Sequence, residues 1–176
     1  MKRLIGILIS VSLVAATGCA SYTPCPVYTP NENCKLVSFK PGLEPKGFNG
    51  IKWETEVSTL TEMKSYRKDP SHGGIYFYLK AGDGYQLKSG KLIPIQYGFW
   101  EGKFYIGMVM TEQTSDWEAL KQSVFEKFGV GAKPFINKEE YLWIGKDVTM
   151  ALVYNEDSKK GTYYIRSHSM EKQMPK

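Results

Sequence analysis

The chain has 176 residues, of which 42% are hydrophobic and 14% aromatic, which is enough for one packed domain and too much for a disordered polar chain. The net charge of +5 falls to +3 without residues 1–18, because 21 basic residues then stand against 18 acidic ones. So small a surplus, with no block of Lys or Arg, excludes an obvious nucleic-acid binder.

Residues 1–18 are predicted to be a signal peptide. Lys2 and Arg3 give a positive start, and the mainly apolar residues 4–16 follow. At about 1.5 Å per residue, this stretch is too short to cross a hydrocarbon core of roughly 30 Å as a stable anchor. Small residues then lead into Cys19. The pattern predicts export from the cytoplasm.

The sequence Ala16-Thr17-Gly18-Cys19 resembles the lipobox of bacterial lipoproteins. The resemblance implies cleavage before Cys19, a diacylglycerol on its sulfur, and an acyl chain such as palmitate on the new N-terminus. The family prefers Leu where this chain has Ala16, and ordinary cleavage after Gly18 remains an alternative.

Ala20, rather than Asp, resembles the sorting pattern for the cell outer membrane, which implies a lipid-anchored protein facing the periplasm. In a bacterium with one membrane, the same anchor would hold it outside the plasma membrane.

The remaining cysteines, Cys25 and Cys34, are predicted to form a disulfide. Disulfides use cysteines in pairs, so three cysteines in an exported protein leave one without a partner, and a lipid on Cys19 accounts for that one. Closing this loop would stabilise the chain by roughly 2.7 kcal/mol in the chain-entropy model. Two free thiols are the alternative. With five prolines nearby, residues 19–47 are expected to form a tether, followed by one domain over 48–170 and a flexible tail over 171–176.

The first half of the domain is expected to hold a helix and three strands. Val57, Leu60 and Met63 recur near helical spacing and favour a helix over 53–66. Aromatic and β-branched residues predict strands over 75–81, 91–100 and 103–112, the last two joined at Glu101-Gly102 as a hairpin. Period-two alternation predicts that one face of the third strand carries Phe104, Ile106, Met108 and Met110.

The second half repeats this order. Ser115 and Glu118 have capping-box spacing at the start of a predicted helix, which Gly129 ends. Its apolar stripe consists of Trp117, Leu120, Val124 and Phe128. Three strands are predicted over 139–145, 148–154 and 161–168. The whole is an α+β fold in the order helix-βββ-helix-βββ, an antiparallel sheet of about six strands with two helices packed on one face.

Two further resemblances concern the domain. Its layout looks like that of the beta-lactamase inhibitor proteins, which are built from two helix-plus-meander modules, and this is a likeness of topology alone. The segments FNGIKW (48–53), QYGFWEGKFY (96–105) and DWEALKQSVFEKFG (116–129) resemble uncharacterised envelope proteins of bacteria. That family implies an opening strand and helix, and it supplies no catalytic residue.

The aromatic side chains of the predicted strands are the main candidate for binding. If both helices cover the Phe104 face, then Trp100 and Tyr105 lie on the open side, and with Tyr141 and Trp143 they form a candidate binding face for a glycan or a protein. The alternative is that these rings pack in the core as cross-strand pairs.

Catalytic chemistry has little foundation in the sequence. Asp69 and Ser71 precede His72 in a turn, and with Asp83 these residues define an alternative hydrolase site. His168 is expected on the surface, and two separated histidines do not make a metal site, so no metal or other cofactor is expected. The phosphate-binding and nucleophile-elbow motifs are absent.

We therefore expect a membrane-anchored envelope lipoprotein that is not an enzyme and acts as a binding or assembly module. Its expected partners are the membrane, through the lipid on Cys19, and an envelope protein or a cell-wall polymer. A periplasmic envelope hydrolase and an inhibitor of an external enzyme are the alternatives.

Overall fold

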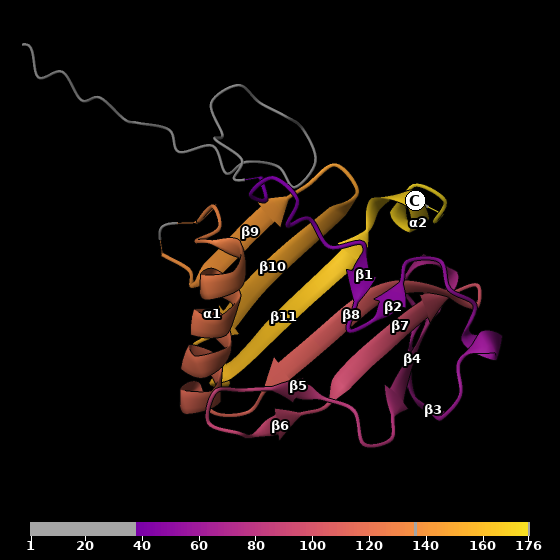
Figure 1. The fold of residues 1–176 in the computed structure, drawn as a ribbon, viewed down its shortest axis with the longest axis horizontal. Coiled ribbons are helices and arrows are strands. Elements are labelled where there is room, and N and C mark those ends of the chain that lie inside the picture. Colours follow the sequence, from indigo (N-terminus) through magenta and orange to yellow (C-terminus); the bar gives the residue numbers. More distant parts are fainter. Residues whose placement is uncertain (1–37, 136, 176) are drawn as a thin grey trace, which may run out of the picture.

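A computed structural model describes residues 38–135 and 137–175. The architecture is α+β, as predicted, and is built on one seven-stranded antiparallel sheet in the order β3-β4-β7-β8-β11-β10-β9 (Figure 1). Its strands are β3 (Met63–Asp69), β4 (Ile75–Lys80), β7 (Ile95–Trp100), β8 (Lys103–Thr111), β9 (Glu140–Ile144), β10 (Val148–Asn155) and β11 (Lys160–Ser167). Two short pairs accompany the sheet: β1 (Gly47–Phe48) with β2 (Ile51–Lys52), and β5 (Tyr85–Gln86) with β6 (Leu92–Ile93). The helical elements are α1 (Thr114–Phe128), α2 (His168–Glu171) and the 3-10 turns η1 (Val57–Thr59) and η2 (Ser71–Gly73).

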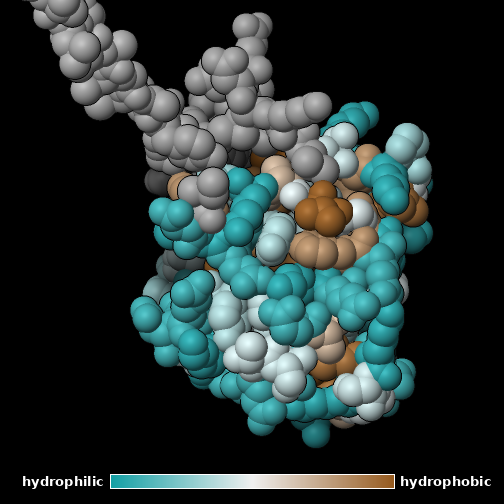
Figure 2. Space-filling model, turned by 90° about the vertical axis from the view of Figure 1, so that its left-hand side faces the viewer, coloured by the Kyte–Doolittle hydropathy of each residue, from teal (hydrophilic) through white to brown (hydrophobic). Residues whose placement is uncertain are grey.

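The helix α1 covers one side of the sheet, which we call the α1 face. All four residues of its predicted apolar stripe are buried, and Gly129 ends the helix with a φ of +81°. The capping-box prediction is wrong, because the N-cap is Gln113 and its side chain makes no capping hydrogen bond. The outward side of α1 is polar, and the side of the molecule that carries it is largely hydrophilic (Figure 2). Within the described residues, no helix is long and apolar enough to cross a membrane.

The predicted helix over 53–66 does not form. Glu54 and Glu62 both have a φ of +67°, in the left-handed region that a right-handed helix excludes. The backbone of this segment instead hydrogen-bonds the start of β8, where Phe104 donates to the carbonyl of Thr55 at 2.9 Å. This segment instead holds η1 and the extended strand β3, so the sheet gains a seventh strand, and residues 38–135 and 137–175 contain one substantial helix where two are expected.

The predicted alternation along β8 is interrupted by a β-bulge. Phe99 of β7 is opposite Phe104, but Gly98 is opposite Ile106, so Tyr105 is an extra residue on β8. Phe104 therefore joins the core beneath α1, while Tyr105 and Ile106 both join a second cluster on the opposite side. The prediction that Phe104 shares a face with Ile106 and Met108 is wrong for this reason.

The second cluster lies beneath the C-terminal residues. Met170 of α2 and Met174 are 0% and 7% exposed and pack against Trp100, Tyr105 and Ile106. The segment over 171–176 was predicted to be a flexible tail, but its described part contributes to this cluster. We call the side of the sheet opposite α1 the open face. Among the described residues, the C-terminal segment covers only the end of this face that carries Trp100, Tyr105 and Ile106.

The segment before residue 48 also packs on the domain. Phe39 is buried, and its ring meets the ring of Phe128 edge-on at 5.8 Å. The Oε1 atom of Glu44 accepts hydrogen bonds from the backbone N–H of Asp147 at 2.6 Å and of Val148 at 3.2 Å. Residues 38–47, expected to belong to the tether, are therefore anchored on β10 and α1.

Candidate functional site

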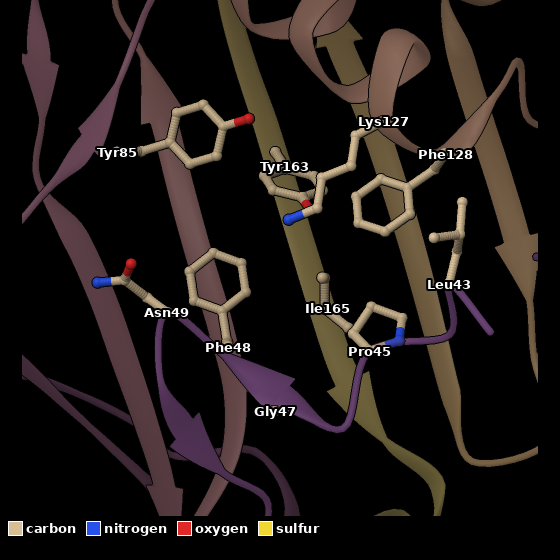
Figure 3. Close-up of a pocket in the computed structure, with 10 residues that line it drawn as sticks. All are labelled: Leu43, Pro45, Gly47, Phe48, Asn49, Tyr85, Lys127, Phe128, Tyr163 and Ile165. Carbon is tan, nitrogen blue, oxygen red and sulfur yellow. The ribbon is translucent and has the colours of Figure 1, made fainter.

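A cavity of about 290 Å³ opens on the α1 face, between β1 and the C-terminal end of α1 (Figure 3). Its floor is β11, and one wall is the segment that leads into β1. The residues that line it are Leu43, Pro45, Gly47, Phe48, Asn49, Tyr85, Lys127, Phe128, Tyr163 and Ile165. We call it the α1 cavity.

The wall over β1 is positioned by a tight hairpin. Asn49 and Gly50 have φ values of +47° and +82°, which matches the Asn-Gly turn that closes two-residue β-hairpins. The hairpin places the Phe48 ring on β8 at Gly107, where an added Cβ would come within 2.3 Å of it. The absence of a side chain at Gly107 therefore makes the space in which Phe48 packs.

The floor is apolar and aromatic. Tyr163 and Ile165 are 3% and 2% exposed, and the Tyr163 ring lies 5.9 Å from the ring of Phe48 and 6.0 Å from that of Tyr85. Burial raises the pKa of the Tyr163 hydroxyl well above its ordinary value, and the hydroxyl faces the sulfur of Met150 at 3.5 Å. Tyr163 therefore remains a neutral phenol at physiological pH.

The polar groups of the rim are mostly engaged with neighbours. Asn49 donates to Asp83 at 2.8 Å and to the hydroxyl of Tyr97 at 2.9 Å, and the Tyr85 hydroxyl pairs with Ser123 at 2.7 Å. These contacts tie the β1–β2 hairpin and β5 to the rest of the domain.

Lys127 is the charged residue of the cavity lining. It belongs to the last turn of α1, and its ammonium group reaches into the middle of the labelled side chains (Figure 3). The Nζ atom lies 5.1 Å from the centre of the Phe128 ring, and Lys127 takes part in none of the ion pairs between described residues. An apolar floor beneath one cation suits a ligand with an apolar body and a negative group.

The four aromatic residues predicted as one binding face are divided between two faces of the sheet. Trp143 is 0% exposed beneath α1, and Tyr141 packs on the same core with its ring 4.8 Å from that of Phe125. Trp100 and Tyr105 lie on the opposite side and are 7% and 4% exposed beneath the C-terminal residues. The prediction that these four residues form one binding face is therefore corrected. Their rings pack in the two cores, which is the alternative that the sequence also offers.

The residues of the alternative hydrolase site are not brought together. His72 lies on the side of the C-terminal residues, with Nδ1 3.2 Å from the carbonyl oxygen of Pro175, and Asp69 accepts the backbone N–H of Ser71 at 2.9 Å. Asp83 instead accepts the hydroxyl of Tyr97 at 2.6 Å, and Tyr97 belongs to the core beneath α1. Asp83 thus lies beside the core beneath α1, away from the turn that holds Asp69, Ser71 and His72.

His168 was expected on the surface but is 8% exposed. Its ring nitrogens contact the Thr149 hydroxyl at 2.8 Å and the Lys146 carbonyl at 3.0 Å, which fixes α2 to β10. Over residues 38–135 and 137–175, no group of three or more His, Cys, Asp or Glu side chains could hold a metal ion. The lipidation site Cys19 and the predicted pair Cys25 and Cys34 lie outside the described residues.

The α1 cavity was not predicted from the sequence. One signal for it was present, because Asn49-Gly50 between apolar residues is typical of a hairpin. Nothing in the sequence places that hairpin beside the end of a helix some eighty residues later. No protein-family model, no curated protein and no solved structure matches this chain.

Proposed function

We propose that this chain is a lipid-anchored binding module of the bacterial envelope, held to the outer membrane through Cys19 and facing the periplasm. It binds its ligand non-covalently in the α1 cavity and does not transform it. The export signal and the lipobox-like Ala16-Thr17-Gly18-Cys19 support the location. An envelope protein or a cell-wall polymer remains the proposed class of larger partner.

One observation carries the proposal: the described end of the predicted tether, residues 38–47, also forms a wall of the cavity. Leu43, Pro45 and Gly47 line the cavity, and residues 38–47 pack on the domain. The 19 residue steps from Cys19 to Ser38 span at most about 65 Å. A lipid on Cys19 would therefore keep Ser38, where the described part of the chain begins, within this distance of the membrane surface.

The lining defines the class of ligand. Phe48, Phe128 and Ile165 offer apolar surface, whereas Lys127 offers a positive charge with no carboxylate partner among the described residues. A molecule with an aromatic or aliphatic body and one acidic group matches both features. An amphiphile of this kind is available at a membrane surface.

The test uses the chain from residue 19 with Cys19→Ser, so that no detergent is needed. The probe is anilinonaphthalene sulfonate, an aromatic anion, and its neutral analogue phenylnaphthylamine is the reference. Lys127→Glu should weaken binding of the anion about tenfold, or about 1.4 kcal/mol, because the attraction becomes repulsion. It should leave binding of the neutral analogue unchanged.

The matched control is Lys64→Glu on the edge strand β3, which makes the same change of net charge away from the cavity. Like Lys127, Lys64 takes part in none of the ion pairs between described residues. This variant should bind the anion within about twofold of the parent, because salt screens distant charges. Equal weakening by both variants, or none by Lys127→Glu, would contradict binding in the α1 cavity.

A further inference from the structure

A second hollow, of about 790 Å³, lies on the open face of the sheet, away from the α1 cavity. It crosses several strands, from the edge strand β3 over β4, β7 and β8 to β11. Its lining consists of Tyr66, Arg67, Leu79, Pro94, Gln96, Met108, Met110, Glu112, Lys160 and Thr162. We call it the open-face groove.

Arg67 reaches this groove because of a bulge in the edge strand. Ser65 is opposite Tyr78 and Arg67 is opposite Phe77, so Tyr66 is an extra residue on β3. A bulge redirects the side chains that follow it. The Arg67 guanidinium lies over the Phe77 ring, with its central carbon 3.7 Å from the centre of the ring.

The guanidinium is also held in its plane by a hydrogen bond. Its Nε donates to Oε1 of Gln96 at 3.0 Å, and Gln96, which is 8% exposed, has its Nε2 3.3 Å from the sulfur of Met110. The Nη2 group lies 4.0 Å from the sulfur of Met108. The Phe77 ring, the hydrogen bond to Gln96 and the thioether of Met108 thus fix the orientation of Arg67 before any partner arrives.

Arg67 takes part in none of the ion pairs between described residues. Hydrogen bonds from Ser71 and, to a smaller extent, the charge of Arg67 lower the pKa of Asp69, two residues further along β3. The acidic residue of the groove, Glu112, is paired with Lys160 at 2.7 Å, so Arg67 leaves one positive charge in excess. A planar guanidinium held with free N–H groups is suited to a carboxylate, which it binds through two parallel hydrogen bonds.

We propose that the open-face groove binds an extended, acidic segment of a partner protein, with one of its carboxylates on Arg67. A free small carboxylate would occupy only the Arg67 end. The groove continues over Leu79, Pro94 and the two methionines, whose flexible side chains adapt to different apolar residues. An extended chain with alternating acidic and apolar residues matches this succession of one cation and apolar surface.

The test uses the full lipidated chain in detergent micelles, with carbon-13 in the methionine methyl groups. The probe is an acetylated and amidated Val-Glu-Val-Glu-Val peptide, and its Val-Gln-Val-Gln-Val counterpart is the reference. The methyl signals of Met108 and Met110 should shift and saturate with the acidic peptide only. Met150, which is fully buried beneath α1, should not shift and reports on the fold.

Arg67→Gln should weaken binding of the acidic peptide about tenfold or more, and Arg67→Lys should restore only part of it, because an ammonium lacks the planar pair of donors. Lys68→Gln is the matched control, since Lys68 is the next residue on β3 but lies over the Tyr76 ring and does not line the groove. It should change the affinity by less than about twofold.

Four outcomes would overturn the proposal. The methyl signals of Met108 and Met110 could fail to saturate with the acidic peptide. The glutamine peptide could bind as tightly as the acidic one. Arg67→Gln could leave the affinity for the acidic peptide unchanged while the methyl signal of Met150 stays where it is in the parent protein. Saturation by sodium acetate at the concentration of the peptide would also overturn it, because the groove would then be a small-anion site.

Discussion

The packing of Phe48 on Gly107 predicts that a substitution at this glycine changes both the stability of the domain and ligand binding in the α1 cavity. Gly107 lies in mid-strand on β8, and an added Cβ would meet the Phe48 ring at 2.3 and 2.4 Å and the Cβ of Phe48 at 2.8 Å. Phe48 is 5% exposed, so its ring could yield only by leaving its packed position and moving toward the α1 cavity. Gly107→Ala should therefore cost about 1–3 kcal/mol as an overpacking change.

The double mutant separates this clash from any other effect of the alanine. Phe48→Ala alone should cost about 3–5 kcal/mol, because it removes a buried ring. Once the ring is absent, alanine at position 107 no longer meets it, and alanine stabilises a strand by roughly 0.5–1 kcal/mol relative to glycine. The two changes should then be coupled by about 1.5–4 kcal/mol, with the double mutant at least as stable as Phe48→Ala.

Urea unfolding of the four proteins, followed by tryptophan fluorescence, measures this coupling. Gly107→Ala should also weaken binding of anilinonaphthalene sulfonate, because a displaced Phe48 ring changes the wall of the cavity. Free energies that add within about 0.5 kcal/mol would refute the packing of Phe48 on Gly107 as described.

Three further predictions concern the rest of the domain. Met170→Ala should lower the free energy of unfolding by about 2–5 kcal/mol in urea, because the Met170 side chain of α2 is fully buried against the sheet. Glu44→Ala should cost about 1–3 kcal/mol and Glu44→Gln less, since an amide oxygen can still accept the N–H groups of Asp147 and Val148; a thermal melt compares the two. Burial raises the pKa of Tyr105 from 10.0 to about 12, so the unfolded chain loses this proton first and stability should fall between pH 10 and about 12. Tyr105→Phe should flatten that part of the stability profile, and an unchanged slope would contradict the burial of the hydroxyl.

The sequence predicted the strands better than the first helix. Strong alternation and the Glu101-Gly102 turn located β7 and β8, and the stripe that begins at Trp117 located α1. Val57, Leu60 and Met63 do pack against the core, as their spacing suggested, but from a 3-10 turn and a strand. Hydrogen bonds to the distant strand β8 replaced the helical ones, and such tertiary pairing is not visible in local periodicity.

The candidate binding residues failed for a related reason. Trp100 and Tyr105 are on the side opposite α1, as predicted, but Met170 and Met174 cover them. The polar residues around these two methionines suggested a frayed end, whereas their four-residue spacing was a signal for one buried side. Arg67 could not have been identified from the sequence, because its direction depends on the bulge at Tyr66.

The intact mass of the protein extracted from bacterial membranes, with and without reduction and thiol alkylation, tests the membrane anchor most directly. We predict cleavage before Cys19 and the added mass of acyl chains, with two thiols alkylated only after reduction, from Cys25 and Cys34. An unacylated chain that begins at Cys19 would contradict the anchor and make the protein a diffusible exported one.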